Sequence, residues 1–163
     1  MTPPSARTLL PRAVAYVVLL AALIMVPRGE TLSYGPELAA AIAAAVRRLG
    51  LEATAAGDVV TGYGFSMRIA PVCDGWDLSL LLGLAILLSP APARARLVGA
   101  AVAVAVTQLL NLGRLVSMFL VGVYVPHLFD LLHHLVWQAA AIVIAVVLYG
   151  AWLRRATAVP HAR

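Results

Sequence analysis

Long apolar stretches, separated by only one sizeable polar region, restrict the fold of this chain more than any other feature. Apolar side chains dominate residues 9–26, 76–88, 97–121 and 131–153. Of all residues, 63% are hydrophobic and 12% are charged, whereas soluble domains average about half apolar and about a quarter charged residues. Because a helix needs about 20 residues to cross a bilayer, we expect an all-α integral membrane protein with about four transmembrane helices.

The polar region, residues 27–71, is expected to form one extracytoplasmic loop. A short helix is predicted over residues 36–49, because Pro and Glu stand in its first turn and Gly50 follows it. Its weak amphipathicity predicts that it lies on the membrane surface or against other helices. Apolar and polar side chains alternate over residues 65–70, which favours a strand in a hairpin. The whole chain, residues 1–163, is predicted to be a single membrane domain.

The charged residues segregate if four spans place both termini on one side. All twelve basic residues are arginines. The arginines on the side of the termini are Arg7, Arg12, Arg94, Arg96, Arg154, Arg155 and Arg163. The other five arginines and all seven acidic residues fall on or near the opposite side. An arginine excess marks the cytoplasmic side, so we expect a multi-pass protein of the cytoplasmic (inner) membrane with cytoplasmic termini. The net charge of +5 is too small to indicate a nucleic-acid partner.

Cys73 is the single cysteine and lies where the polar loop meets the second span. A lone cysteine is usually a small buried apolar residue, and this structural interpretation stays open. The alternative is a nucleophile, since the positive end of a helix favours the reactive thiolate. Asp74 is placed to cap that helix, and Asp77 lies at nearly the capping-box spacing. Because both carboxylates disfavour a thiolate, a cation must come from elsewhere in the chain.

Arg114 is the costliest residue of the third span, since an arginine inside a membrane costs about 2.5 kcal/mol or more. At about 100° per residue, Thr107, Asn111 and Arg114 share one helix face, which should point into the helix bundle. In one interpretation Arg114 pairs with an acid while Asn111 and Thr107 bond neighbouring helices. In the other, its guanidinium stabilises the negative charge that develops during acyl transfer.

His133 and His134 open the fourth span, and Asp130 is expected to cap this helix and to orient an imidazole. A histidine beside Cys73 can accept its proton and later protonate a leaving amine, although either histidine can instead be a plain interfacial anchor. Adjacent histidines converge poorly on one zinc ion, and HExxH and CxxC patterns are absent. We expect no metal and no cofactor. The topology predicts that the cysteine, arginine and histidine meet at the extracytoplasmic face.

The ordered set formed by Cys73-Asp74-Gly75, Asn111-Leu112-Gly113-Arg114 and the histidine pair resembles the exosortase/archaeosortase family. Residues 121–126 and Trp137-Gln138 are most similar to the exosortase H type, and the resemblance covers roughly residues 60–153. Relatives commonly carry a small residue directly after the cysteine, where this chain has an acid. The site prediction depends on all three motifs occurring together in this order, because each motif alone is weakly specific.

The resemblance implies a cysteine transpeptidase or protease that cleaves a C-terminal sorting signal of exported proteins. This signal is a short motif followed by a transmembrane helix and a basic tail. Cys73 would form a thioester, Arg114 would stabilise the oxyanion, and His133, preferred over His134, would be the acid and base. Supporting roles would fall to Asn111, Asp130 and Gly75. The product would pass to an envelope acceptor that the sequence does not specify. The alternative is a non-enzymatic membrane scaffold or assembly factor.

Overall fold

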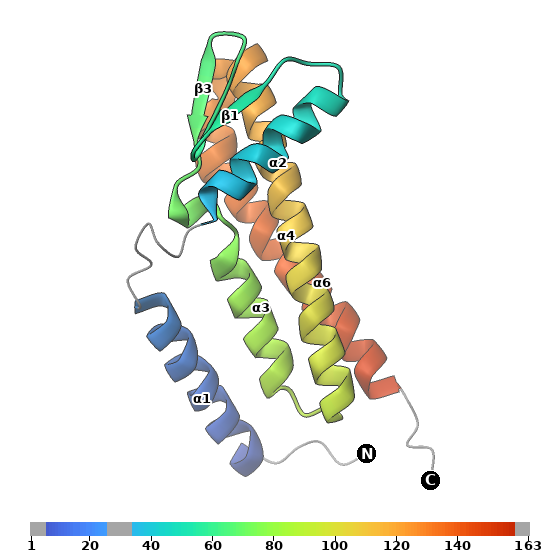
Figure 1. The fold of residues 1–163 in the computed structure, drawn as a ribbon. Coiled ribbons are helices and arrows are strands. Elements are labelled where there is room, and N and C mark those ends of the chain that lie inside the picture. Colours follow the sequence, from blue (N-terminus) through green and yellow to red (C-terminus); the bar gives the residue numbers. More distant parts are fainter. Residues whose placement is uncertain (1–5, 26–33, 159–163) are drawn as a thin grey trace. The chain divides into compact units, whose positions relative to one another are not determined.

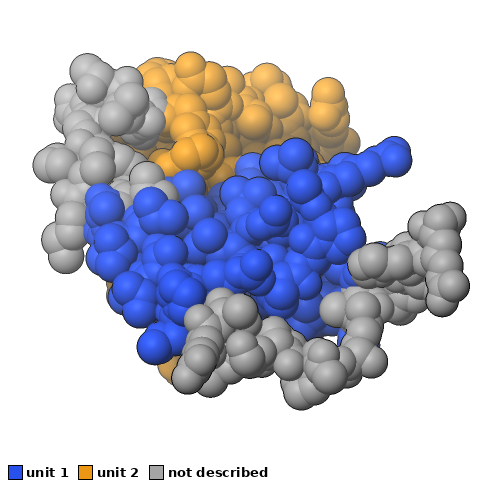
Figure 2. Space-filling model, turned by 90° about the horizontal axis from the view of Figure 1, so that it is seen from below, with its two compact units in different colours: residues 1–27, 77–106, 143–163 blue, residues 28–76, 107–142 orange. Residues whose placement is uncertain are grey.

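The computed structural model describes residues 6–25 and 34–158, and it is mostly helical (Figure 1). Its helices are α1 (Ala6–Met25), α2 (Gly35–Arg48), α3 (Trp76–Leu88), α4 (Ala93–Tyr124), α5 (Phe129–Leu131) and α6 (Trp137–Ala158). Its strands are β1 (Thr54–Ala56), β2 (Val59–Gly62) and β3 (Phe65–Arg68). The chain divides into two compact units (Figure 2): unit 1 comprises residues 1–27, 77–106 and 143–163, and unit 2 comprises residues 28–76 and 107–142.

Helix α2 packs on the small sheet of unit 2 through one fully buried face. The buried residues are Leu38, Ala39, Ile42, Ala43 and Val46, and α2 contacts β1 and β2. The prediction that this helix lies against other helices is confirmed in part, because Leu115, Met118 and Phe119 of α4 share its buried cluster. The sheet is a further partner that the sequence did not indicate. Alanines occupy both faces of α2, so its amphipathicity is concealed in the sequence. The bounds agree with the predicted helix to within one residue at each end.

The predicted hairpin is present, and a third strand extends it. Strands β1, β2 and β3 form an antiparallel sheet in that order. Gly62 pairs with Phe65, so a two-residue loop joins β2 and β3. Tyr63 and Gly64 both have positive φ, at 53° and 76°, which is the requirement of a type I′ turn. The predicted alternation along β3 is confirmed, because Met67 is buried while Ser66 and Arg68 are exposed.

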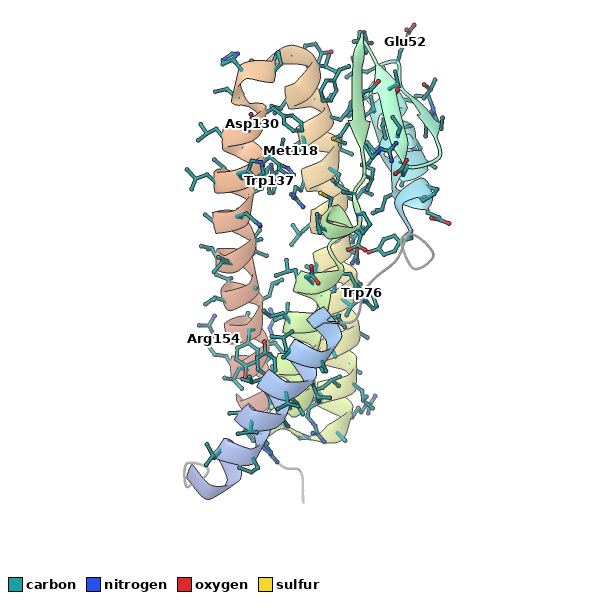
Figure 3. The ribbon with its side chains drawn as sticks, turned by 90° about the vertical axis from the view of Figure 1, so that its left-hand side faces the viewer. Glu52, Trp76, Met118, Asp130, Trp137 and Arg154 are labelled. Atoms are coloured by element: carbon teal, nitrogen blue, oxygen red, sulfur yellow. The ribbon has the colours of Figure 1, made fainter. Side chains whose placement is uncertain are left out.

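The core of unit 2 lies between α2, the sheet and the second half of α4. Helix α4 contributes Leu115, Met118 and Phe119, and Trp137 packs against this cluster (Figure 3). Helix α4 also exceeds the predicted residues 97–121 at both ends. At its C-terminal end the backbone N–H of Val125 donates to the carbonyl oxygen of Val121 at 2.8 Å, so the helix stops directly before a proline.

The chain turns sharply after α4 and enters a second long helical segment. The turn is the 3-10 helix η3 (Pro126–Leu128), which is shorter than the predicted interruption at residues 122–129. Helix α5 follows, and then the π-helical turn η4 (Leu132–Val136) leads into α6. Proline explains the break, because it lacks the N–H that would continue α4. The sequence carries no comparable signal for the π-helical turn.

Unit 1 contains α1, α3, the first part of α4 and the last part of α6. Leu82, Ile86, Ala100 and Ala103 form its buried apolar cluster. The hydroxyl groups of Ser89 and Tyr149 lie 2.7 Å apart, which satisfies two polar groups in an apolar setting. Helix α3 begins and ends where the sequence predicts, at residues 76 and 88.

Among the described residues, two helical segments are long and apolar enough to cross a membrane: Ala93–Tyr124, with 32 residues, and Pro126–Ala156, with 31 residues. Helices α1 and α3 contain the shorter apolar stretches Leu10–Ala22 and Trp76–Leu87. Of the four predicted spans, two therefore meet the length that a bilayer requires.

Candidate active site

The loop that carries Cys73 is a single 3-10 turn, η2 (Pro71–Cys73), ahead of α3. The N–H of Cys73 donates to the carbonyl oxygen of Ala70 at 2.8 Å, which closes the turn. The carboxylate of Asp74 accepts a hydrogen bond from the N–H of Trp76 at 2.8 Å, so Asp74 satisfies a free donor at the start of α3, as predicted. Cys73 itself is half-buried and packs against the core of unit 2.

Asn111 of α4 fixes this loop through its carboxamide. Its Nδ2 donates to the carbonyl oxygen of Cys73 at 3.0 Å, and the side chain is buried, as predicted for this face of α4. Gly75 allows the close approach: it has a φ of 76°, and a Cβ atom there would lie 2.7 Å from Cγ of Asn111. Glycine is thus required at position 75 for two reasons: the backbone has a positive φ, and Asn111 of the second motif leaves no room for a Cβ atom.

Arg114 lies one helical turn after Asn111 and is half-buried. Its Nη1 donates to Oδ1 of Asn111 at 3.3 Å. Its Nε is buried and has no hydrogen-bond partner among the described residues. Thr107, the third member of the predicted polar face, is fully buried, with 1% of its surface exposed. The prediction that this face points into the protein is confirmed for Thr107 and Asn111.

The histidines lie in the π-helical turn η4. The ring of His133 stacks on Phe129, with centroids 5.8 Å apart and planes 14° apart. The ring of His134 meets that of His133 edge-on at 4.7 Å. His133 is half-buried and His134 is exposed. Phe129, on which His133 stacks, packs against the same buried core of unit 2 as Cys73 does. π-Helical turns are rare and often occur at functional sites.

Asp130 does not cap the last helical segment, contrary to the sequence prediction. It lies inside α5, whose N-terminal flanking residue is Leu128. The helix starts earlier than predicted because η3 already turns the backbone after Pro126. The carboxylate of Asp130 is exposed, and Asp130 lies in the same helical segment as the histidines, without a capping role (Figure 3).

Two further polar residues hold the cysteine loop, and sequence reasoning missed their role. The hydroxyl of Tyr34 lies 2.6 Å from the carbonyl oxygen of Asp74 and 3.0 Å from Oε1 of Gln108. Gln108 is a polar residue inside an apolar helix, which is a detectable signal. Tyr34 precedes α2 in the polar region, where nothing in the sequence distinguishes it from other loop aromatics.

The described part of unit 2 thus brings together residues that are far apart in the sequence. The carbonyl oxygen of Cys73 accepts a hydrogen bond from Asn111, Asn111 accepts one from Arg114, and His133 stacks on Phe129 against the same core. The arrangement offers a thiol, a guanidinium with an unused buried donor, and an imidazole. Within residues 6–25 and 34–158, no three His, Cys, Asp or Glu side chains converge as a metal site would require.

Comparison with known proteins identifies no relative, because no family model, curated protein or solved structure matches this chain.

Proposed function

We propose that this protein is an exosortase-like cysteine transpeptidase of the cytoplasmic membrane. The observation that carries the proposal is the hydrogen-bonded path from the Cys73 carbonyl through Asn111 to Arg114, with His133 stacked on Phe129 against the same core of unit 2. At least 18 residues of sequence separate each of the three motifs that resemble the exosortase family from the next. A scaffold that used each polar residue only for local helix packing would not need all three in one cluster.

The membrane setting is supported by the exposure of the apolar helices. In the segment Pro126–Ala156, only 6% of the most apolar window is buried. Ile142, Val143 and Val146 each expose more than half of their surface, at 66%, 61% and 67%. Water-soluble proteins rarely expose a continuous apolar surface of this kind. We propose four spans, with α1 and α3 completing the set, both termini in the cytoplasm and Cys73 on the extracytoplasmic side.

The proposed chemistry is acyl transfer. The thiolate of Cys73 attacks the carbonyl carbon of a peptide bond in the sorting signal and forms a tetrahedral oxyanion. The guanidinium of Arg114 stabilises that oxyanion through its free donors. When the oxyanion collapses to a thioester, the C–N bond breaks and His133 gives a proton to the leaving amine. An acceptor nucleophile then loses its proton to His133, attacks the thioester and releases Cys73.

The decisive experiment is co-expression with an exported protein that ends in a short motif, an apolar helix and an arginine-rich tail. Mass spectrometry of the new C-terminus separates hydrolysis from transfer. We expect wild-type protein to shorten the substrate and Cys73→Ala to leave it intact. Because a half-buried thiol contributes little packing, Cys73→Ala should insert and fold normally. Size-exclusion chromatography in detergent checks this, and a thiol-specific reagent that does not cross membranes should label wild-type Cys73 in intact cells.

The competing function, a non-enzymatic scaffold or assembly factor, predicts a different pattern. Cys73→Ala would then be silent in every assay, whereas Arg114→Ala would reduce the amount of folded protein. Normal substrate processing by Cys73→Ala refutes the transpeptidase. Loss of processing in a folded Cys73→Ala variant excludes the scaffold as the sole function.

A further inference from the structure

Unit 1 contains an apolar groove between α4 and α6. Its volume is about 390 Å³, which lies within the range of about 300–1,000 Å³ that is typical of ligand pockets. Apolar side chains form most of its walls, and one cationic side chain stands at its edge. The residues that matter here are Val98, Val102, Val106, Leu148, Trp152 and Arg155.

The groove is a fixed feature of the packing of unit 1. The indole N–H of Trp152 donates to the carbonyl oxygen of Ala95 at 3.3 Å, which holds the ring against α4. Gly99 lies under this ring, and a Cβ atom there would collide with the indole nitrogen. Val98 and Val102 each leave 56% of their surface exposed in the wall. A ligand with an apolar chain would cover this exposed surface.

The charge beside the groove comes from arginines. The guanidinium of Arg96 donates to the carbonyl oxygen of Leu87 at 3.0 Å, which ties the start of α4 to the end of α3. Arg155 lines the groove, and Arg154 precedes it near the end of α6 (Figure 3). The one acidic residue among the described residues of unit 1 is Asp77, and it opens α3, about 17 Å along the helix from Leu88.

We propose that this groove binds an anionic phospholipid, with an acyl chain along the valine wall and the phosphate on Arg155. Basic pockets between membrane helices on the cytoplasmic side bind anionic head groups, and tryptophan favours the membrane interface. The proposed sorting signal is a poorer occupant, because its basic tail would be repelled by the arginines. The inference rests on the membrane setting but not on the thiol chemistry, so the two proposals fail independently.

The test uses the full chain, purified in detergent, and two lipids with identical acyl chains: phosphatidylglycerol, which is anionic, and phosphatidylcholine, which is neutral overall. Native mass spectrometry at increasing lipid concentration gives the affinity of each. We expect wild-type protein to bind phosphatidylglycerol more tightly. Arg155→Gln should weaken that binding about fivefold, the factor expected for one basic residue near anionic lipid, and should leave phosphatidylcholine binding unchanged. Arg48→Gln is the matched control, since it removes the charge of an exposed arginine in unit 2.

A second variant tests the groove itself. Val102→Trp places a larger side chain in the exposed wall and should reduce the binding of both lipids, while Arg155 stays in place. Equal affinity of wild-type protein for the two lipids overturns the proposal, as does an Arg155→Gln variant that behaves like Arg48→Gln. If a helical peptide with an arginine tail binds the groove more tightly than phosphatidylglycerol, and Val102→Trp removes that binding, the groove is a peptide site and the lipid proposal is wrong. Arg155→Gln alters an exposed side chain, so it tests the proposal even if Val102→Trp does not fold.

Discussion

Gly75→Ala tests whether the cysteine loop and α4 are locked together as the structure indicates. Gly75 has a φ of 76°, and an alanine in this left-handed conformation costs about 1–2 kcal/mol. The new Cβ would also lie 2.7 Å from Cγ, 2.8 Å from Cβ and 2.8 Å from Nδ2 of Asn111. Because the crowding reaches the Cβ of Asn111, the amide cannot escape by a simple rotation, and the helix or the loop must move.

The magnitude follows from the contacts that Asn111 would lose. Its carboxamide makes two hydrogen bonds, one to the carbonyl oxygen of Cys73 and one from Arg114. A neutral hydrogen bond contributes about 1 kcal/mol and one from a charged group about 1.5–3 kcal/mol. Added to the backbone strain, the loss of both reduces the free energy of unfolding by about 3.5–6 kcal/mol. Substrate processing should fall as well, since the Cys73 backbone loses its anchor.

Gly64→Ala is the matched control for this prediction. Gly64 has the same φ of 76°, but a Cβ atom there would meet nothing within 4 Å. It should therefore cost only the backbone strain, about 1–2 kcal/mol. Unfolding in detergent gives both free energies, and the rate at which a maleimide alkylates Cys73 reports on the loop directly. If the two variants are equally stable and Cys73 reacts at the same rate in both, the proposed lock between Gly75 and Asn111 is wrong.

Two other substitutions test neighbouring parts of unit 2. Tyr34→Phe removes the hydroxyl that bonds Asp74 and Gln108, and it should lower the unfolding free energy by about 1–2 kcal/mol. Tyr124→Phe, which alters an exposed tyrosine, is the control. Equal melting temperatures of the two variants would contradict the reasoning. Phe119→Ala should cost about 3–5 kcal/mol, because Phe119 is completely buried against the sheet and α2. A melting temperature within a few degrees of wild type would show that this cluster is not the core of unit 2.

The regular elements of this chain could be predicted because their signals are local. Helix α3 was predicted over its observed range, since Asp74 and Pro90 mark its two ends. The alternation of β3 and the turn at Gly64 likewise depend on adjacent residues. Strand β1 was missed because Thr54–Ala56 has neither strong β propensity nor a buried side: all three residues are exposed. It becomes a strand only by pairing with β2.

The residues of the candidate site could be predicted, but the hydrogen bonds that connect them could not. Cys73, Arg114 and His133 are conspicuous because each is chemically unusual in an apolar chain. That Asn111 joins two of them, and that Tyr34 holds the loop from the other side, depends on backbone carbonyls, which every residue carries. The capping role expected of Asp130 failed for a related reason. Helix starts are set by the backbone as much as by side chains, and Pro126 starts this segment before the acid is reached.

The π-helical turn Leu132–Val136 has a consequence for how this segment tolerates change in length. A π turn closes a hydrogen bond one residue further along than an α turn does, so it behaves as a single inserted residue held within the helix. Deleting one residue from it would let an ordinary α-helix form. Because the π turn already absorbs the extra residue, the residues after Trp137 would keep nearly the same orientation relative to Asp130, whereas a deletion within a regular α-helix rotates everything beyond it by about 100°. A one-residue deletion within Leu132–Val136 should therefore disturb α6 less than the same deletion within the regular α-helical turns of α6 itself.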